Sequence, residues 1–310
     1  MAISKEEIKR VKGQGFLLNR GTERFSARVI TENGVLSAAQ LQNLSEAAQQ
    51  FGNGNVTFTT RLTVEIPGIA HDQIQALQDY IAREGMETGG TGAKVRPVVS
   101  CKGTTCVFGL HDTQGLAKQI HERMYKGYRE VSFPHKFKIA VGGCPNNCVK
   151  PDLNDLGIVG QRVPKPNLEK CRGCARCVVE AGCPMKAAKV ENGKLTIDEN
   201  KCSNCGRCTE KCPFGTMEGS ETLYKVYVGG RWGKQTRMGS PLSKLFTRSE
   251  VLDVVEKVAL FYRSQGIPGE RFGTTVDRVG LSKVEEAVLS DELLARKEEI
   301  LKAPVGGTAH

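Results

Sequence analysis

The sequence lacks any apolar run close to the roughly 20 residues that a membrane-spanning helix needs. Its first residues, Met1 to Glu7, lack the apolar core of a secretory signal peptide. Free thiols persist in a reducing compartment, and the chain is rich in cysteine. We therefore expect a cytoplasmic protein without a membrane span.

Two recognition motifs are also missing. No G-x-G-x-x-G follows a predicted strand, so we expect no NAD or flavin site in this chain. The formal charge is +10, but the lysines and arginines are scattered and not interleaved with aromatic residues, which argues against nucleic acid as a partner. Two interpretations of the charge stay open: a solvated basic surface, or basic side chains facing a carboxylate-rich cofactor, an oxyanion substrate or an acidic electron carrier.

Cysteine, by contrast, is abundant, and its twelve copies fall into three groups of four. The first group consists of C-K-G-T-T-C at Cys101–Cys106 and C-P-N-N-C at Cys144–Cys148. Four thiolates that converge from two loops suit one [4Fe–4S] cluster. Disulfide bonds would leave the division into three quartets unexplained.

The other eight cysteines form a repeat within residues 165–219. Each half reads C-x-x-C-x-x-C followed by C-P, which is the pattern of bacterial two-cluster ferredoxins rather than of a zinc site. The first half is longer, with five residues between Cys177 and Cys183. Because the fourth cysteine of each run ligates the other cluster in that pattern, the predicted sets are Cys171, Cys174, Cys177 and Cys212, and Cys202, Cys205, Cys208 and Cys183.

The first hundred residues alternate between strand and helix patterns. Arg24–Ile30 and Val56–Ile66 have the period of two that is typical of strands, with Arg61 on the polar face of the second. Ser37 is a predicted N-cap for a helix that ends near Gly52, and a second helix is expected at 72–83. With a strand at 95–100, the order strand–helix–strand–helix–strand predicts an α+β unit of the ferredoxin-like kind.

Further strands are expected at 137–141, 156–160 and 224–229, and helices at 112–125, 249–264 and 285–301, before a frayed tail at 306–310. The predicted division is a ferredoxin-like half-domain at 1–90, an α/β domain made of 91–164 and 220–310, and an inserted two-cluster ferredoxin domain at 165–219. Each pair of the first cysteine group follows a strand, where loops carry sites in α/β proteins.

These motifs resemble the sulfite and nitrite reductase family that binds sirohaem and a [4Fe–4S] cluster. The first cysteine group, followed by L-N-D-L-G-I-V-G at Leu153–Gly160, resembles its sirohaem and cluster domain, and T-T-R-L-T at Thr59–Thr63 resembles its ferredoxin-like half-domain. The inserted ferredoxin is most similar to the small anaerobic sulfite reductase catalytic subunits. One departure is that four residues, not five, separate Cys101 from Cys106.

The resemblance implies sirohaem, three [4Fe–4S] clusters and the six-electron reduction of sulfite to sulfide, with nitrite to ammonia as the second possibility. Cys148 would be the thiolate that links the cluster to the sirohaem iron. Because sirohaem carboxylates and oxyanions both need cations, the candidate basic residues are Arg61, Arg24 and Arg28, together with Lys102 and Lys150 beside cluster cysteines. Gly142 and Gly143 are expected to let the backbone approach the cluster.

An alternative stays open: an electron-transfer subunit with three clusters and no sirohaem. Since larger family members contain two copies of this unit, we expect a homodimer or a higher assembly. The electron donor would be a ferredoxin or dedicated reductase subunits.

Overall fold

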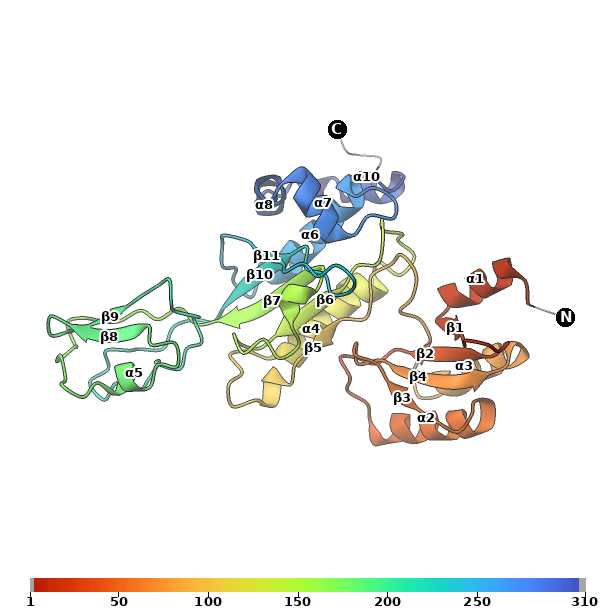
Figure 1. Ribbon diagram of the computed structural model, residues 1–310, viewed down its shortest axis with the longest axis horizontal. Helices are drawn as coiled ribbons and strands as arrows, with labels where there is room; N and C mark the ends of the chain where they lie inside the picture. The colour runs from red at the N-terminus through yellow and green to blue at the C-terminus, as the bar shows by residue number, and fades with distance from the viewer. Residues whose placement is uncertain (1–2, 307–310) are drawn as a thin grey trace.

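Two sheets and one small hairpin form the framework of the computed structural model, which describes residues 3–306 (Figure 1). The first sheet has the order β1-β2-β4-β3, and all of its pairs are antiparallel. Its strands are β1 (Phe16–Leu18), β2 (Phe25–Val29), β3 (Thr57–Phe58) and β4 (Val64–Ile69). Helix α1 (Lys5–Gly13) precedes it, and α2 (Ala38–Phe51), η1 (His71–Gln73) and α3 (Ile74–Ala82) complete the unit.

Local chemistry explains where α2 begins. The Ser37 hydroxyl accepts the Gln40 N–H at 3.0 Å, and the Gln40 side chain accepts the Ser37 N–H at 3.0 Å. This reciprocal capping box satisfies two backbone donors that the first helical turn leaves free. The predicted cap is therefore confirmed, although Leu41 of the expected apolar face is exposed and Asn43 is buried instead.

The prediction of one long strand over 56–66 is wrong, because the segment is a hairpin. Strands β3 and β4 pair antiparallel, and the Thr59 N–H donates to Thr63 O at 2.8 Å across the turn. The turn contains no glycine or proline, and Leu62 takes a positive φ of 59°, which bulky residues rarely adopt. Arg61 consequently lies at a hairpin tip rather than on a strand face.

The second sheet forms the centre of the molecule, with the order β11-β10-β7-β6-β5. Strands β5 (Val99–Ser100), β6 (Ile139–Gly142) and β7 (Leu156–Gln161) are parallel, whereas β10 (Leu223–Val228) and β11 (Ser240–Pro241) are antiparallel. Helix α4 (Thr113–Ile120), capped by Asp112, continues as the π-helix η3 (His121–Lys126). With α6 (Val251–Gln265), these elements cover an extensive apolar core.

The single helix predicted at 285–301 is wrong as well. The chain forms α7 (Phe272–Val279), α8 (Leu281–Leu289), α9 (Glu292–Ala295) and α10 (Lys297–Lys302), with α8 ending at the extended residue Ser290. In one continuous helix, Ile300 would point about 120° away from Val288. The breaks allow both side chains to be buried in the same core. Of the predicted frayed tail, residues 307–310 lie outside the described residues.

Between β7 and β10 the chain leaves the central sheet and forms a projecting segment (Figure 1). This insertion, residues 162–222, contains α5 (Val178–Ala181) and the hairpin of β8 (Ala188–Glu191) and β9 (Lys194–Ile197). The five-residue spacer after Cys177 holds the short helix α5. Two 3₁₀ turns, η2 (Gly103–Thr105) and η4 (Pro151–Leu153), complete the elements. Within residues 3–306, no helix is both long and apolar enough to cross a membrane.

Candidate functional site

The first cysteine quartet lies on two loops at the carboxyl ends of neighbouring parallel strands. Cys101 follows β5, and Cys144 and Cys148 follow β6, while the short turn η2 leads to Cys106. Burial raises the pKa of the Cys144 thiol, and negative charge on Cys101, Cys148 and Cys106 raises it further, as expected when four sulfurs are close neighbours. With the four-residue spacing from Cys101 to Cys106, all four thiols lie on loops that follow two neighbouring strands.

Glycine at positions 142 and 143 permits close packing behind this quartet. A Cβ atom on Gly143 would lie 3.1 Å from Gly103 Cα and 3.4 Å from Cys101 Sγ, and one on Gly142 would lie 3.0 Å from Pro151 Cγ. The Gly143 N–H also donates to Cys101 Sγ at 3.2 Å. Such N–H···S hydrogen bonds favour the thiolate that a cluster ligand requires.

The insertion brings together one of the two predicted ferredoxin quartets. Cys183 lines an apolar cavity together with Cys202, Cys205 and Cys208, although it belongs to the first cysteine run. The thiol of Cys208 has a pKa raised by burial and by negative charge on the other three. This crossing of runs is the arrangement that the two-cluster ferredoxin pattern predicts.

Backbone donors surround the remaining quartet. Leu195 N–H donates to Cys171 Sγ at 3.3 Å. The nearby side chain of Thr216 and the surrounding backbone N–H groups lower the pKa of the Cys212 thiol. In the described part of the chain, no three Cys, His, Asp or Glu side chains are close enough to hold one metal ion. The thiolates of a [4Fe–4S] cube bind different irons, so a cube does not require three ligands around one ion.

A separate cavity of about 240 Å³ lies between the half-domain and the central domain, and we call it the cation cavity. Five basic side chains line it and no carboxylate does, which makes it a site for anions. The other lining residues are threonines, glycine and proline. The five basic residues are Arg28, Arg61, Arg96, Lys136 and Lys138.

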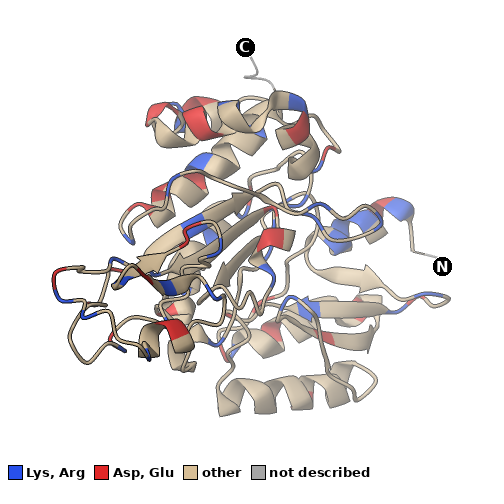
Figure 2. Cartoon of the chain, turned by 60° about the vertical axis from the view of Figure 1, so that its left-hand side comes forward, with Lys and Arg blue, Asp and Glu red and all other residues tan. Residues whose placement is uncertain are grey.

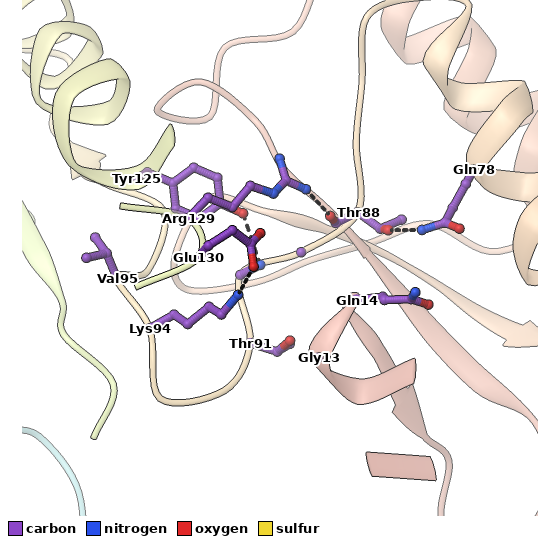
Figure 3. Close-up of a pocket in the computed structure, with 12 residues that line it drawn as sticks. Gly13, Gln14, Gln78, Thr88, Thr91, Lys94, Val95, Tyr125, Arg129 and Glu130 are labelled. Carbon is purple, nitrogen blue, oxygen red and sulfur yellow. Dashed lines mark hydrogen bonds and ion pairs between the residues drawn. The ribbon is translucent and has the colours of Figure 1, made fainter. Parts of the chain in front are cut away.

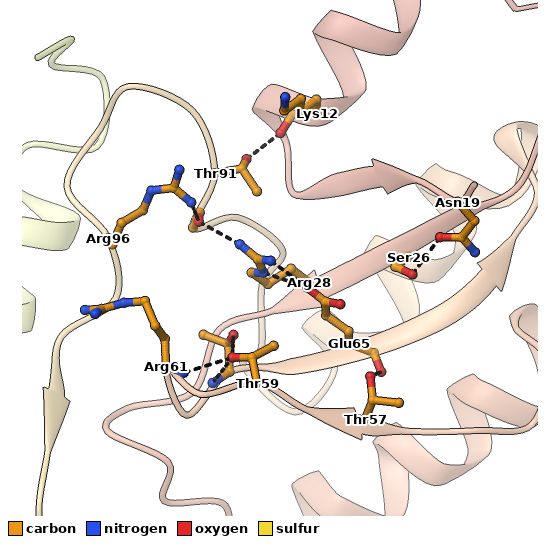
Figure 4. Close-up of polar contacts among 12 residues, drawn as sticks. Lys12, Asn19, Ser26, Arg28, Thr57, Thr59, Arg61, Glu65, Thr91 and Arg96 are labelled. Atoms are coloured by element: carbon orange, nitrogen blue, oxygen red, sulfur yellow. Dashed lines mark hydrogen bonds and ion pairs between the residues drawn. The ribbon is translucent and has the colours of Figure 1, made fainter. Parts of the chain in front are cut away.

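Arg61 points into this region from the hairpin that carries Thr59 (Figure 4), and it links the cavity to the loop of the first cysteine quartet. From its hairpin tip, its guanidinium donates to Pro97 O at 2.7 Å, to Ile139 O at 3.2 Å and to Asn154 Oδ1 at 2.9 Å. Asn154 in turn donates to Lys150 O at 3.0 Å, two residues beyond Cys148. The half-domain is thus fastened to the loop that carries the exposed cysteine of the quartet.

Arg28 and Arg96 converge from opposite sides of the cavity. Both guanidinium groups donate to Gly90 O, as Figure 4 shows, and Arg28 also pairs with Glu65 at 2.6 Å. Burial lowers the pKa of Arg61 to about 10, and the positive charges of Arg96 and Arg28 act in the same direction. Burial also lowers the pKa of Arg96 to about 10, with a further contribution from Arg28. Cations crowded in this way favour the entry of a compensating anion.

Lys138 has the pKa best suited to proton transfer. Burial lowers it to about 8, and the positive charges of Arg61, Lys136 and Arg271 act in the same direction. The buried Asp155 lies behind it, accepting the Lys138 backbone N–H at 2.9 Å and two hydrogen bonds from Arg271. A lysine with this pKa exchanges a proton near neutral pH, as general acid–base chemistry requires.

The candidate basic residues separate into two groups. Arg61 and Arg28 line the cation cavity, whereas Arg24, Lys102 and Lys150 are exposed and do not line it. Lys150 lies 5.6 Å from the ring of Trp232. Sequence reasoning missed Arg96, Lys136 and Lys138. The alternation K-F-K around the buried Phe137 was a usable signal, because it places both lysines on one face just before β6.

A neighbouring cavity of about 250 Å³ shares Gly90 with the cation cavity but has a different character (Figure 3). Its lining includes the ion pair of Lys94 with Glu130 at 3.2 Å, and Arg129 is paired with Glu87. Its charges are therefore largely balanced. Across the molecule, basic segments occur on the half-domain, the central domain and the insertion (Figure 2). In the cation cavity, Arg28 is paired with Glu65, but no ion pair of the described residues balances Arg61, Arg96, Lys136 or Lys138.

Family comparisons agree with this architecture. Residues 91–297 match the nitrite and sulphite reductase 4Fe-4S domain, and residues 18–83 match the nitrite/sulfite reductase ferredoxin-like half domain. The fold is similar to the crystal structure of dissimilatory sulfite reductase I, with a TM-score of 0.69 and 24% identity, over 86% of this chain and 69% of that one. It is also similar to the NirA protein of Mycobacterium tuberculosis, with a TM-score of 0.66 and 17% identity, over 98% and 48%.

Two curated relatives are similar in sequence. The coenzyme F420-dependent sulfite reductase of Methanocaldococcus jannaschii is 33% identical over 252 residues, which cover 80% of this chain but only 39% of that protein. A subunit of the anaerobic sulfite reductase of Salmonella typhimurium is 29% identical over 297 residues, covering 87% of this chain and 84% of its relative. With both domain matches in place, the chain belongs to the nitrite and sulfite reductase family.

Proposed function

We propose that this protein reduces sulfite to sulfide, with nitrite to ammonia as the second candidate reaction. The observation that carries the proposal is the cation cavity, which five basic side chains and no carboxylate line, and from which Arg61 is linked through Asn154 to the loop of Cys148. Sulfite, nitrite and the carboxylates of sirohaem are all anions that such a cavity would bind. Family membership supports the same chemistry.

The cysteines would hold three [4Fe–4S] clusters. Cys101, Cys106, Cys144 and Cys148 would hold the cluster of the central domain, with Cys148 also facing sirohaem. When bound, sirohaem and this cluster would pass electrons from the donor to the oxyanion, six for each sulfite. The two insertion quartets would hold the clusters that bring those electrons from a ferredoxin or from reductase subunits.

The basic residues would bind the oxyanion and supply protons. Arg28 and Arg96 converge on one point from two domains and suit a planar fork-like grip on oxygen. Lys138, with its pKa lowered to about 8, would donate protons as the oxygens of sulfite leave as water. Arg61 is held by Asn154 and two backbone carbonyls, so its role would be to fix the half-domain against the cysteine loop and to contribute charge.

The exposed position of Cys148 suggests that a further surface covers the site. We propose that a second copy of the chain, or a partner subunit, supplies it. A monomer that binds sirohaem and turns over at full rate would contradict this assembly.

Turnover with reduced methyl viologen tests the proposal directly. Protein purified anaerobically after expression with a sirohaem supply should oxidise the viologen when sulfite or nitrite is added, and form sulfide or ammonia. Arg96→Ala should lose this activity, whereas Arg24→Ala, outside the cavity, should retain it. Absence of product with either substrate would refute the function.

The alternative of a three-cluster electron-transfer subunit makes a different prediction. Such a protein would show only the broad absorption of iron–sulfur clusters, without the red bands of sirohaem. The cation cavity favours the enzyme, because a subunit that only relays electrons has no need of a concave anion site.

A further inference from the structure

The insertion leans against the loops that carry the first cysteine quartet. At its start, Arg162 N–H donates to Asn204 O at 2.7 Å, and Arg162 forms a parallel bridge with Cys205. A cavity of about 170 Å³ lies at the junction. Cys144 and Asn146 line it from the central domain, and Cys205 and Arg207 from the insertion. One ferredoxin quartet therefore reaches the central quartet through a shared wall.

Two features hold this junction tightly. Gly206 has a φ of 67°, and a Cβ atom there would lie 2.9 Å from the Arg162 side chain. The Arg207 guanidinium lies 5.1 Å from the ring centre of Phe108, two residues beyond Cys106. This cation–π contact links the loop between Cys205 and Cys208 to the loop of the central quartet.

The other ferredoxin quartet has its contacts at the outer end of the insertion. Lys194 Nζ donates to Cys171 O at 3.0 Å, and Leu195 N–H donates to Cys171 Sγ. Both stand at the start of β9, beside the hairpin turn, whereas the other end of the hairpin, at Ala188 and Ile197, lines the cavity of the Cys202 quartet. Figure 1 shows the hairpin in the part of the insertion away from the central sheet. Here too an arginine covers a phenylalanine: Arg172 lies 4.3 Å from the ring centre of Phe214, within the insertion itself.

We infer a fixed order for the two ferredoxin quartets. Cys183, Cys202, Cys205 and Cys208 are the inner ligand set, which passes electrons to the central quartet across the Arg207–Phe108 junction, and Cys171, Cys174, Cys177 and Cys212 are the outer set, which receives them. Each transfer oxidises the outer cluster by one electron and reduces the inner one by one electron. A reduced flavin or iron–sulfur protein is the electron source, and the oxyanion is the final acceptor. This inference rests on the cluster content of the proposed function.

Electron paramagnetic resonance of the dithionite-reduced holoprotein tests the order without relying on turnover. In the fully reduced protein, each cluster is paramagnetic, and a close neighbour splits its signal. The matched variants are Cys205→Ala and Cys174→Ala, because each removes the middle cysteine of one run. We expect Cys205→Ala to lose the splitting of the central signal and Cys174→Ala to keep it. Any other pattern, including loss in Cys174→Ala alone, overturns the order.

Measuring the iron content would reveal a cysteine variant that fails to assemble its clusters. A second pair of variants, which keeps all the cysteines, covers that case. Arg207→Ala should weaken the splitting, and Arg207→Lys, which keeps the cation over Phe108, should restore part of it. Arg172→Ala removes the equivalent contact of the outer set and should leave the splitting unchanged. Equal effects of Arg207→Ala and Arg172→Ala would contradict the inference. A chain that reduces neither sulfite nor nitrite would refute the proposed function but still report this order.

Discussion

The half-domain and the insertion are attached to the same central domain but are stabilised in different ways. The half-domain has its own core of fifteen buried apolar residues, and Arg61 fastens it to the central domain. The insertion has five buried apolar residues, and four of them, Val179, Ala188, Leu195 and Met217, form a small core with cysteines packed around it. A core this small cannot offset the entropy of ordering the segment. Packing therefore stabilises the first region, and we expect the second to depend on the clusters that its cysteines would bind.

Preparing the protein without iron should produce the largest difference in stability between the insertion and the half-domain. In the iron-free protein we expect the insertion to unfold while the half-domain keeps its structure, because metal binding to such a small domain supplies its folding free energy. Hydrogen exchange should show amides of the β8–β9 hairpin losing protection and amides of β2 and β4 keeping it. Full protection of β8–β9 without iron would contradict the account.

The second largest effect is expected from breaking the hydrogen bonds of Arg61, which join the half-domain to the central domain. Arg61→Ala removes three hydrogen bonds from a charged group and leaves Asn154 and two carbonyls without their partner, so we expect a loss of about 3 kcal/mol in the free energy of unfolding. Arg24→Ala, on the exposed surface, should change it by less than about 0.5 kcal/mol. Urea unfolding measures both, and equal losses would show that Arg61 is not a fastening residue.

Protonation of Lys138 should sharpen the contrast between the cation cavity and its balanced neighbour. Its pKa in the folded protein is about 8, so its charge is present below that pH and is lost as the pH rises through it. We expect oxyanion affinity, measured by calorimetric titration with sulfite, to fall about tenfold above this pH, as loss of a charged hydrogen bond implies.

The control for this pH dependence is Lys138→Arg. A guanidinium stays charged across the range, so the variant should retain affinity above pH 8. The same titration with the variant also separates the protein's response from the ionisation of sulfite itself. Identical pH profiles for the two proteins would exclude Lys138 as the titrating group.

The smallest expected effect concerns the half-domain alone. Ser37→Ala removes the capping box of α2 and should cost about 1 kcal/mol of stability. Ser45→Ala, in the same helix on an exposed face, should be neutral or slightly stabilising, because alanine favours helix. Thermal unfolding of both variants checks the difference, and a neutral Ser37→Ala would show that the cap is dispensable.

The fold was predictable from the sequence where residue patterns report the local backbone conformation, as at strand ends and helix caps. Strand β6 ends at Gly142 and precedes the C-P-N-N-C loop as expected, and Ser37 caps α2. The hairpin at Thr59–Thr63 was missed because its alternation runs on through the turn and Leu62 takes a left-handed conformation without a glycine signal. Local residue patterns do not reveal a turn whose backbone conformation is set by contacts elsewhere in the fold.

The site was predictable in its cysteines more than in its cations. The regular spacing of the cysteines groups them into quartets. In the two-cluster ferredoxin pattern the fourth cysteine of each run joins the other run, and Cys183 does lie with the second run. The cation cavity instead combines Arg28 of β2, Arg61 of a hairpin tip, and Arg96, Lys136 and Lys138 of the central domain. Lys102 and Lys150 were predicted because each lies close to a cysteine in the sequence, but both are exposed and do not line the cavity.

A spectroscopic titration tests the central claim most directly, namely that the cation cavity binds an oxyanion beside a sirohaem held by the Cys148 loop. The anaerobic holoprotein should show the red band of sirohaem, and sulfite should shift that band in a saturable way. Arg96→Ala combined with Lys138→Gln should keep the band but lose the saturable shift. Absence of the red band, or an unchanged shift in the double variant, would contradict the account.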